Sequence, residues 1–491
     1  MIPAHGGPYL EFALAALAAQ TYPDHLMEVL VVDDGSSPPI ELPEIRPFNT
    51  RVVRVTDGWG ISNAVNTGAL AADGEIIQRL DADMVPCREH IEALARWHHV
   101  TDYLVTIGMK RFVEPPPLKA EQIYRAGHLE ELFDLDAAVA SSTEATIAKT
   151  DGLRKSRNPY HVCTGPTLAL PREIFHAVGG LDPHVHRGGD TEFAYRLAMH
   201  GVVFIPDLAA KAVHLGLPAQ RVDKDRVVRA VEPAFAHRIP LRRDLRKDRG
   251  RRWLVPYVEI VFEIGDAPAD VVRQAVASAL DGNLQDVVVT LVAPWSTLRD
   301  ERRSVLGDPS FELRMMRDLF AYDDRVRLID EAAPTPAPIP FRYRGPVEVP
   351  LHRATLERMV ETAQKDLDGV LVVDVGAGRT ARLERTSALA RAVLLAGRSD
   401  DPDAVIEHTH GVRQADPSRY WPPPPTPDPT PKAPASTPRV TPETPAAAEP
   451  PAAAEPPVRA AKPAGPATPD PAHAPEEKTL LNRLKSALRP N

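Results

Sequence analysis

The chain has 491 residues and a formal net charge of −9 at pH 7, with 43% hydrophobic and 5% aromatic residues. This length allows two or three domains, the scarcity of aromatic residues argues against a β-sandwich or a propeller, and the mixture of both charges gives no field expected to gather nucleic acid. Cys87 and Cys163 are too few for a disulfide framework or a cysteine-based zinc site, and no apolar run reaches the roughly 20 residues that span a bilayer, so we expect a soluble, cytoplasmic protein.

The first 80 residues alternate between strand and helix patterns. Residues 1–6 read as the end of a strand that enters a loop, so part of the first strand is expected to be missing from this reading frame. The expected elements then are a helix over 10–18, a strand at 29–32, a strand at 51–55, a helix through 63–71 and a strand at 75–80. This order predicts a largely parallel sheet covered by helices, which binds ligands beyond the carboxyl ends of its strands.

Carboxylates follow two of these strands. Asp33 and Asp34 come after the apolar run 29–32, and Asp81 and Asp83 come after the run 75–80. An Asp-x-Asp at a strand end offers oxygen ligands to Mg²⁺ or Mn²⁺ and leaves coordination positions for substrate phosphates. A single motif of this kind is usually a solvated turn, so the prediction rests on the whole set. We predict Asp83 as the stronger metal ligand and Asp81 as a contact of the metal or a ribose, in a site for a nucleotide-sugar.

A third acidic site lies further along the chain. Residues 114–160 are irregular and charged, and the pattern predicts a flap that contains a helix rich in Glu and Leu after Pro115-Pro116-Pro117. Order then returns at 164–170, followed by helices at 172–178 and 191–200. Asp190 stands at the start of the last helix, where capping alone explains an acid. The functional alternative is that Asp190 is a general base. His214 follows a further strand and is a candidate metal ligand, although a lone histidine is more often structural.

The remainder of the chain divides by composition. We predict a first domain at 1–220, a basic connecting segment at 221–252, a second α/β region at 253–415, a disordered Pro/Ala-rich tether at 416–475 and a short amphipathic helix at 476–491. The run 30–36 aligns with 290–296, and 73–83 aligns with 368–378, which indicates an internal repeat. Gly376 and Gly378 then stand at the positions of Asp81 and Asp83, so the second region is predicted to be a degenerate copy without the acidic site. The terminal helix would dock on a partner or a membrane surface, or else be a frayed, solvated tail.

Six motifs in order resemble those of family 2 glycosyltransferases with the GT-A fold, the Rossmann-like fold of nucleotide-diphospho-sugar transferases. They are Pro3-Ala4-His5, Val32-Asp33-Asp34-Gly35-Ser36, the stretch 60–68, Leu80-Asp81-Ala82-Asp83, the stretch 175–182 and the stretch 189–197. The resemblance covers roughly residues 1–217 and implies an inverting, metal-dependent enzyme that uses a nucleoside-diphosphate sugar, usually a UDP-sugar. Val65 and Gly189 depart from the family pattern, because an arginine and an acid often stand there.

The resemblance also implies a role for each matching residue. Those expected to bind the donor nucleotide are Pro3, His5, Asp33, Asp34, Asn66 and Asp81. Asp83, Asp81 and His214 are expected to hold Mn²⁺ or Mg²⁺, and Asp190 is expected to be the catalytic base. Glu192, Arg196 and Gly165 are expected on the acceptor side or behind these groups.

The function predicted from the sequence is transfer of a sugar to an acceptor hydroxyl by direct displacement. The acceptor is a glycan, a lipid or a small molecule, and the protein is expected in the cytoplasm or at the membrane periphery. The alternative is a noncatalytic scaffold made of two GT-A-like modules with a tail that recruits partners. A nucleotidyltransferase with the same metal chemistry is a lesser alternative, because it explains the helix-start motif at Asp190 poorly.

Overall fold

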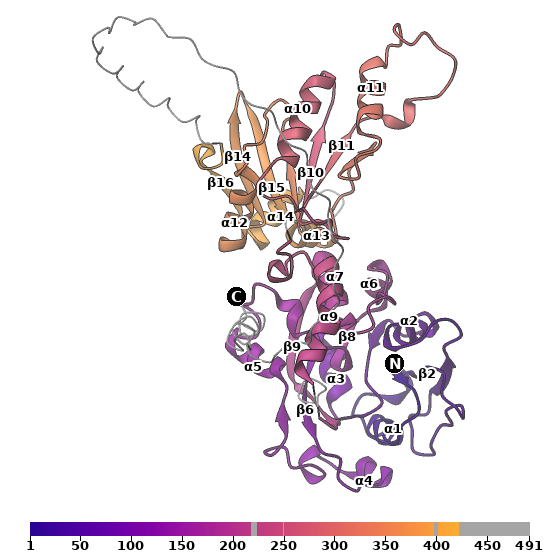
Figure 1. The fold of residues 1–491 in the computed structure, drawn as a ribbon. Helices are drawn as coiled ribbons and strands as arrows, with labels where there is room; N and C mark the ends of the chain where they lie inside the picture. The colour runs from indigo at the N-terminus through magenta and orange to yellow at the C-terminus, as the bar shows by residue number, and fades with distance from the viewer. Residues whose placement is uncertain (218–222, 249, 397–400, 422–491) are drawn as a thin grey trace, which may run out of the picture. The chain divides into compact units, whose positions relative to one another are not determined.

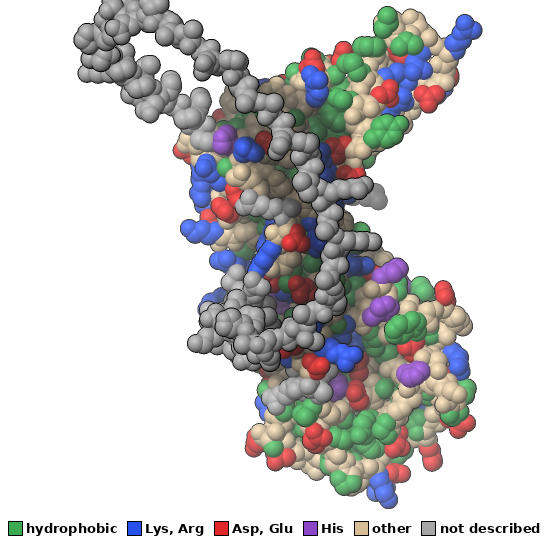
Figure 2. Space-filling view, in the orientation of Figure 1, with side chains coloured by type: hydrophobic (Ala, Val, Ile, Leu, Met, Phe, Trp, Pro, Cys, Tyr) green, Lys and Arg blue, Asp and Glu red, His purple; other side chains and the backbone are tan. Residues whose placement is uncertain are grey.

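The structure is a computed structural model that describes residues 1–217, 223–248, 250–396 and 401–421. Residues 1–422 form one compact unit. The terminal helix predicted at 476–491 and almost all of the tether predicted at 416–475 lie outside the described residues. In the described part of the chain, no helix is both long and apolar enough to cross a membrane. Acidic and basic side chains are interspersed over the face of the molecule seen in Figure 2.

The chain begins with a small parallel sheet of strand order β1-β2-β3. Its strands are β1 (Ile2–Ala4), β2 (Val29–Asp33) and β3 (Thr50–Arg54). Every residue of β2 is buried, because α1 (Leu10–Ala18) and α2 (Ile61–Ala71) pack on opposite sides of the strands (Figure 1). A strand covered on both faces needs a continuous apolar run rather than an alternating one. The predicted helix and buried strand are therefore both present.

A second sheet continues the first through the start of the chain. Its strand order is β4 (Ile76–Gln78), β8 (Leu168–Pro171), β6 (Leu104–Val113), β9 (Val203–Leu215) and β5 (Met84–Pro86). The Leu80 N–H donates to the Met1 carbonyl at 3.0 Å, which joins this sheet to the edge of β1. The ends of β2 and β4 therefore open at the same side of the combined sheet. Behind it, α7 (Gly189–Met199) buries Phe193, Tyr195 and Leu197 in the main apolar core.

The segment predicted as an irregular flap has its own packed elements. It contains α4 (Ala120–Arg125), β7 (Val139–Ala140) and α5 (Ser142–Lys149). Ile123, Leu129 and Phe133 pack against Phe12 of α1. The sequence predicts a helix after the three prolines, and α4 follows them; β7 and α5 were missed because they are shorter than the windows over which periodicity is measured. The basic connecting segment is likewise folded: α9 (Lys224–Arg238) buries Phe235.

The second α/β region is built on one sheet of strand order β12-β11-β10-β13-β15-β14-β16. The strands are β10 (Val258–Glu263), β11 (Val287–Val292), β12 (Val326–Ile329), β13 (Phe341–Arg344), β14 (Val370–Gly376), β15 (Arg379–Arg385) and β16 (Val412–Ala415). The helices are α10 (Ala269–Leu280), α11 (Phe311–Phe320), α12 (Thr355–Asp366), α13 (Thr386–Leu395) and α14 (Pro402–Thr409). The α/β class predicted for this region is confirmed.

Only the first part of the predicted repeat has a spatial counterpart. The units β1-α1-β2-β3 and β10-α10-β11-β12 share element order, parallel pairing and strand order. Beyond them, β4 joins the edge of β1, whereas β13 and β15 separate β14 from β10. The alignment of 73–83 with 368–378 is therefore wrong as a spatial correspondence. Gly376, Ala377 and Gly378 form the turn of the β14–β15 hairpin, all three with positive φ.

A buried ion pair crosses the central strands of this second sheet. Arg342 Nε donates to Glu259 Oε2 at 2.9 Å, Thr290 Oγ1 donates to Glu259 Oε1 at 2.9 Å, and Arg342 is 1% exposed. Glu259→Gln would remove the hydrogen-bonded counter-ion of the buried Arg342 and leave only Glu384 on the neighbouring strand, so we expect a loss of up to about 3–5 kcal/mol in the free energy of unfolding. Urea unfolding measures it. The control is Asp270→Asn, which breaks an exposed pair with Arg273 and should change little. Equal effects of the two variants would contradict the expectation.

Candidate active site

The three residues predicted as metal ligands come together at the carboxyl end of the sheet. Asp81, Asp83 and His214 each offer one ligand atom, and these atoms lie within 4.8 Å of one another. The two aspartates stand between β4 and β5, while His214 lies on β9. The register of β5 with β9 places Met84 opposite His214, and the Leu215 N–H donates to the Asp83 carbonyl at 2.9 Å. Strand pairing therefore fixes the histidine beside the acidic loop.

The electrostatics of this group suit a divalent cation. Burial raises the pKa of Asp83, the charge of His214 opposes that rise, and the nearby Asp81 adds to it. His214 Nε2 lies 3.5 Å from Asp83 Oδ1, and its buried Nδ1 has no hydrogen-bond partner among the described residues. Two carboxylates and an imidazole match the preferences of Mn²⁺ and related ions. The donor set therefore fits the metal that the sequence predicts.

Asp33 and Asp34 differ in how freely they face a ligand. Asp33 is 1% exposed and accepts a hydrogen bond from the Ser36 N–H at 2.8 Å. Burial favours its neutral acid, but the hydrogen bonds from Ser36 and the charge of Arg54 lower its pKa overall. Asp34 is half-buried, and its Oδ2 accepts from the Gly60 N–H at 2.8 Å. Asp34 is thus the more accessible of the two carboxylates.

The other predicted donor contacts surround the same strand ends. Pro3 lies in β1 opposite Val32, so it borders the crevice through its backbone position. His5 is exposed, and its Nδ1 lies 2.6 Å from the Asp34 carbonyl oxygen. Asn66 is already engaged: its Nδ2 donates to the Leu181 carbonyl at 2.8 Å, and its Oδ1 accepts from the Leu181 N–H at 2.9 Å. In this structure Asn66 ties α2 to the loop before α7.

Asp190 lies at the first turn of α7. Its Oδ2 accepts from the Gly165 N–H at 3.2 Å, and its Oδ1 accepts from the Thr191 N–H at 2.9 Å. Gly188, just before the helix, has φ +78°, a backbone conformation that residues other than glycine rarely adopt. These contacts orient a half-buried carboxylate at the helix end that carries the positive dipole.

Glu192 and Arg196 pair with each other instead of facing the site. Arg196 Nε and Nη2 donate to the two carboxylate oxygens of Glu192 at 2.8 and 2.7 Å. Glu192 is 3% exposed, so this ion pair is a largely buried contact within α7. Gly165 does lie in the site, where its N–H reaches Asp190.

Two basic residues of the site, Arg79 and Lys110, were not predicted from the sequence. Arg79 donates to Asp81 Oδ1 from Nε at 3.0 Å and from Nη2 at 2.8 Å. Its guanidinium packs so closely on Gly165 that an added Cβ there would lie 1.9 Å from Nη1. Arg79 therefore touches both the metal group and the loop that holds Asp190. Its position two residues before Asp81 could have indicated that it pairs with this carboxylate.

Lys110 on β6 is the second cation. It is 8% exposed, and its Nζ donates to Thr164 Oγ1 at 2.8 Å. Burial lowers the pKa of Lys110 to about 8, against the pull of the Asp81 and Asp190 charges. The ammonium group thus lies within electrostatic reach of both the metal group and the helix-start acid. No motif surrounds it in the sequence.

The combined sheet, its acidic strand ends and the carboxylate at the start of α7 have the arrangement of the GT-A fold. Residues 1–179 match the family model described as glycosyl transferase family 2. The match ends just before the loop that leads into α7, and the second α/β region lies outside it.

The chain is also similar to a chondroitin synthase of Pasteurella multocida (strain Pm70). The two are 24% identical over 352 residues, which is 66% of this chain and 34% of the relative. The chain therefore spans about a third of the length of this relative.

Solved structures of glycosyltransferases align with about half of the chain. A mannosyltransferase from Pyrobaculum calidifontis in complex with GDP-Man and Mn²⁺ has a TM-score of 0.32 and 20% identity, over 48% of this chain and 62% of that one. GalNAc-T7 with UDP, GalNAc and Mn²⁺ has a TM-score of 0.34 and 17% identity, over 50% and 51%. TarS of S. aureus, residues 1–349, has a TM-score of 0.32 and 15% identity, over 48% and 65%.

Proposed function

We propose that the chain transfers a sugar from a nucleoside-diphosphate sugar to an acceptor hydroxyl with inversion at the anomeric carbon. The observation that carries this proposal is the arrangement of Asp81, Asp83 and His214 beside Asp190, with Arg79 in contact with both sides. A UDP-sugar is the proposed donor, as the ordered motifs imply. Asp34 would accept hydrogen bonds from the nucleoside at the end of β2.

Each group has a place in a direct displacement. Asp190 accepts the proton of the acceptor hydroxyl while that oxygen forms its bond to the anomeric carbon. The bond from this carbon to the diphosphate oxygen breaks, and the nucleoside diphosphate leaves with the electron pair. Asp83, Asp81 and His214 would hold Mn²⁺ or Mg²⁺, which supplies charge neutralisation for the diphosphate. Arg79 fixes the Asp81 carboxylate.

The experiment is a donor panel. Purified full-length protein is incubated with Mn²⁺ and UDP-, GDP- or dTDP-sugars, with and without acceptor extracts, and nucleotide release is measured. Release that depends on metal, and that is largest with a UDP-sugar, is the expected result. If no donor is bound or hydrolysed by protein with an intact circular dichroism spectrum and a cooperative melt, the proposal fails.

Lys110 provides a prediction within this proposal. Its buried ammonium would form a charge-assisted hydrogen bond or ion pair with the donor diphosphate, so Lys110→Met should lower kcat/KM for the donor about 10- to 100-fold. Steady-state kinetics at saturating Mn²⁺ measure this. Lys211→Met removes an exposed lysine from the adjacent strand β9 and should leave kcat/KM unchanged. A Lys110→Met enzyme within about twofold of the native value would contradict the role, since one such bond is worth far more.

A further inference from the structure

A cavity of about 640 Å³ lies at the far end of α7 from Asp190. Its wall includes Ala198 and Met199 of α7, the segment after α5, and residues of the second α/β region. An α-helix rises 1.5 Å per residue, so the length of α7 puts this cavity about 15 Å away along the helix. It is separate from the donor site and larger than needed for water alone. The volume falls in the range of small-molecule sites.

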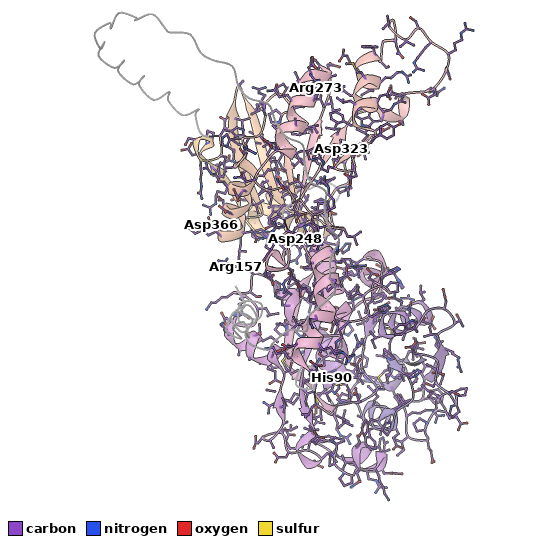
Figure 3. All side chains as sticks on the ribbon, in the orientation of Figure 1. His90, Arg157, Asp248, Arg273, Asp323 and Asp366 are labelled. Carbon is purple, nitrogen blue, oxygen red and sulfur yellow. The ribbon has the colours of Figure 1, made fainter. Side chains whose placement is uncertain are left out.

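The charged residues on the cavity wall are mostly basic. Four arginines line it, Arg154, Arg157, Arg385 and Arg391, together with His410. Asp151 is the one acidic residue among its described lining residues, and it lies 3.8 Å from Lys155. Figure 3 labels Arg157, which lies on the segment between α5 and residue 160. The cavity therefore carries an excess of positive charge.

In the described part of the chain, the two arginines from the second region form no ion pair, although the charge of Asp368 acts on Arg385 from a distance. Arg385 donates to the carbonyls of Asp368 and Ala363 at 3.2 and 2.6 Å, and Arg391 donates to the Gly201 carbonyl. Among the residues that the structure describes, no carboxylate oxygen lies within 4.0 Å of either guanidinium. Burial lowers the pKa of each arginine to about 10. Partly buried positive charge without an anion is unfavourable, and a bound anion would relieve it.

His410 adds a neutral hydrogen-bonding group to the same wall. Burial, together with the charges of Arg391 and Arg385, lowers the pKa of His410 to about 4. His410 and both arginines line the same cavity. Arg154 and Arg157 are exposed, so they can meet a ligand as it enters. Guanidinium groups bind carboxylate, sulfate and phosphate through paired N–H donors.

We propose that this cavity binds an oxyanion, either as a free inorganic anion or as the carboxylate of an acidic sugar. Arg391 and Arg385 would bind the anionic group, and Arg154 and Arg157 would attract it at the opening. The apolar wall, with Trp97 and Phe204, would accommodate the body of a sugar ring. This site is independent of the donor chemistry proposed above.

Calorimetric titration of the full-length chain in EDTA tests the site without metal-dependent donor binding. The probes are inorganic phosphate, sulfate and glucuronate. We expect at least one to bind and to raise the melting temperature. Arg391→Gln should weaken that binding about 10- to 100-fold, the value of one charge-assisted hydrogen bond. The double variant Arg154→Gln/Arg157→Gln should weaken it as well, and it changes only exposed side chains.

The matched control is Arg273→Gln, which removes an exposed arginine from α10 and should leave every Kd unchanged. Tighter binding of glucuronate than of phosphate or sulfate would assign the site to acidic sugars, and the reverse order would assign it to inorganic anions. The proposal is overturned if no probe binds with a Kd below roughly 10 mM, or if the double variant and Arg391→Gln bind as the native protein does. If Arg391→Gln folds poorly, the double variant still tests the site, because Arg154 and Arg157 are exposed and their substitution should not affect folding.

Discussion

Asp190→Asn is expected to lower kcat about 10²- to 10⁴-fold, the usual contribution of a positioned general base. Asparagine keeps a carbonyl oxygen that can accept one of the hydrogen bonds now made by the N–H groups of Gly165 and Thr191. It cannot take a proton from the acceptor at neutral pH. The loss should therefore appear in kcat, while the Kd of the nucleotide donor stays within about twofold of the native value because donor binding is spared.

Stopped assays with saturating donor and isothermal titration with the free nucleotide separate these two quantities. Glu173→Gln is the matched control, because Glu173 also stands in the first turn of a helix, α6 (Arg172–Ala177), and is exposed. It should retain native kcat. If Asp190→Asn kept more than a tenth of the native kcat, a loss smaller than general bases cause, the assignment of Asp190 would be wrong.

Asp83→Asn is expected to weaken Mn²⁺ binding by at least about 10- to 100-fold. Substituting a residue that only hydrogen-bonds to a metal ligand already lowers metal affinity by that factor. Burial and the nearby Asp81 raise the pKa of Asp83, so a cation beside this carboxylate would stabilise its charged form. Activity at low Mn²⁺ should fall in parallel and recover in part at high Mn²⁺. His214→Gln should act in the same direction.

Mn²⁺ binding is measured by the water-proton relaxation of the ion, and activity by nucleotide release across a Mn²⁺ series. Asp73→Asn changes an exposed acid shortly before β4 and is the control for net charge. If both Asp83→Asn and His214→Gln bound Mn²⁺ with native affinity, the assignment of the metal to this site would be wrong. Unchanged melting temperatures in the absence of metal would show that the variants report on the ion alone.

The strand ends of the first domain were predictable because their patterns are local. A buried strand on a doubly covered sheet must read as an apolar run, so Asp33 and Asp81 marked where β2 and β4 end. His214 was harder to place. The sequence puts it after a strand, but only the register of β5 with β9 shows that it faces Asp83.

Other features depend on contacts between distant residues, which periodicity does not carry. Lys110 sits inside the apolar strand β6, and its reach to Thr164 follows from the order of strands in the sheet. Asn66 matched a motif, yet its amide is engaged by the backbone of Leu181. The repeat failed for a similar reason, since β13 occupies the place beside β10 that the alignment gave to β14.

The hairpin turn between β14 and β15 limits how the second region could be redesigned. Gly376 has φ +88° and Gly378 has φ +69°, and the intervening Ala377 has φ +56°. Aspartates placed at 376 and 378 would have to adopt positive φ angles, which residues other than glycine usually avoid. They would also stand on a strand that does not adjoin β10. A two-centred enzyme could therefore not be engineered from this chain by restoring two carboxylates at 376 and 378; the carboxylates would have to follow β13, the strand that pairs with β10.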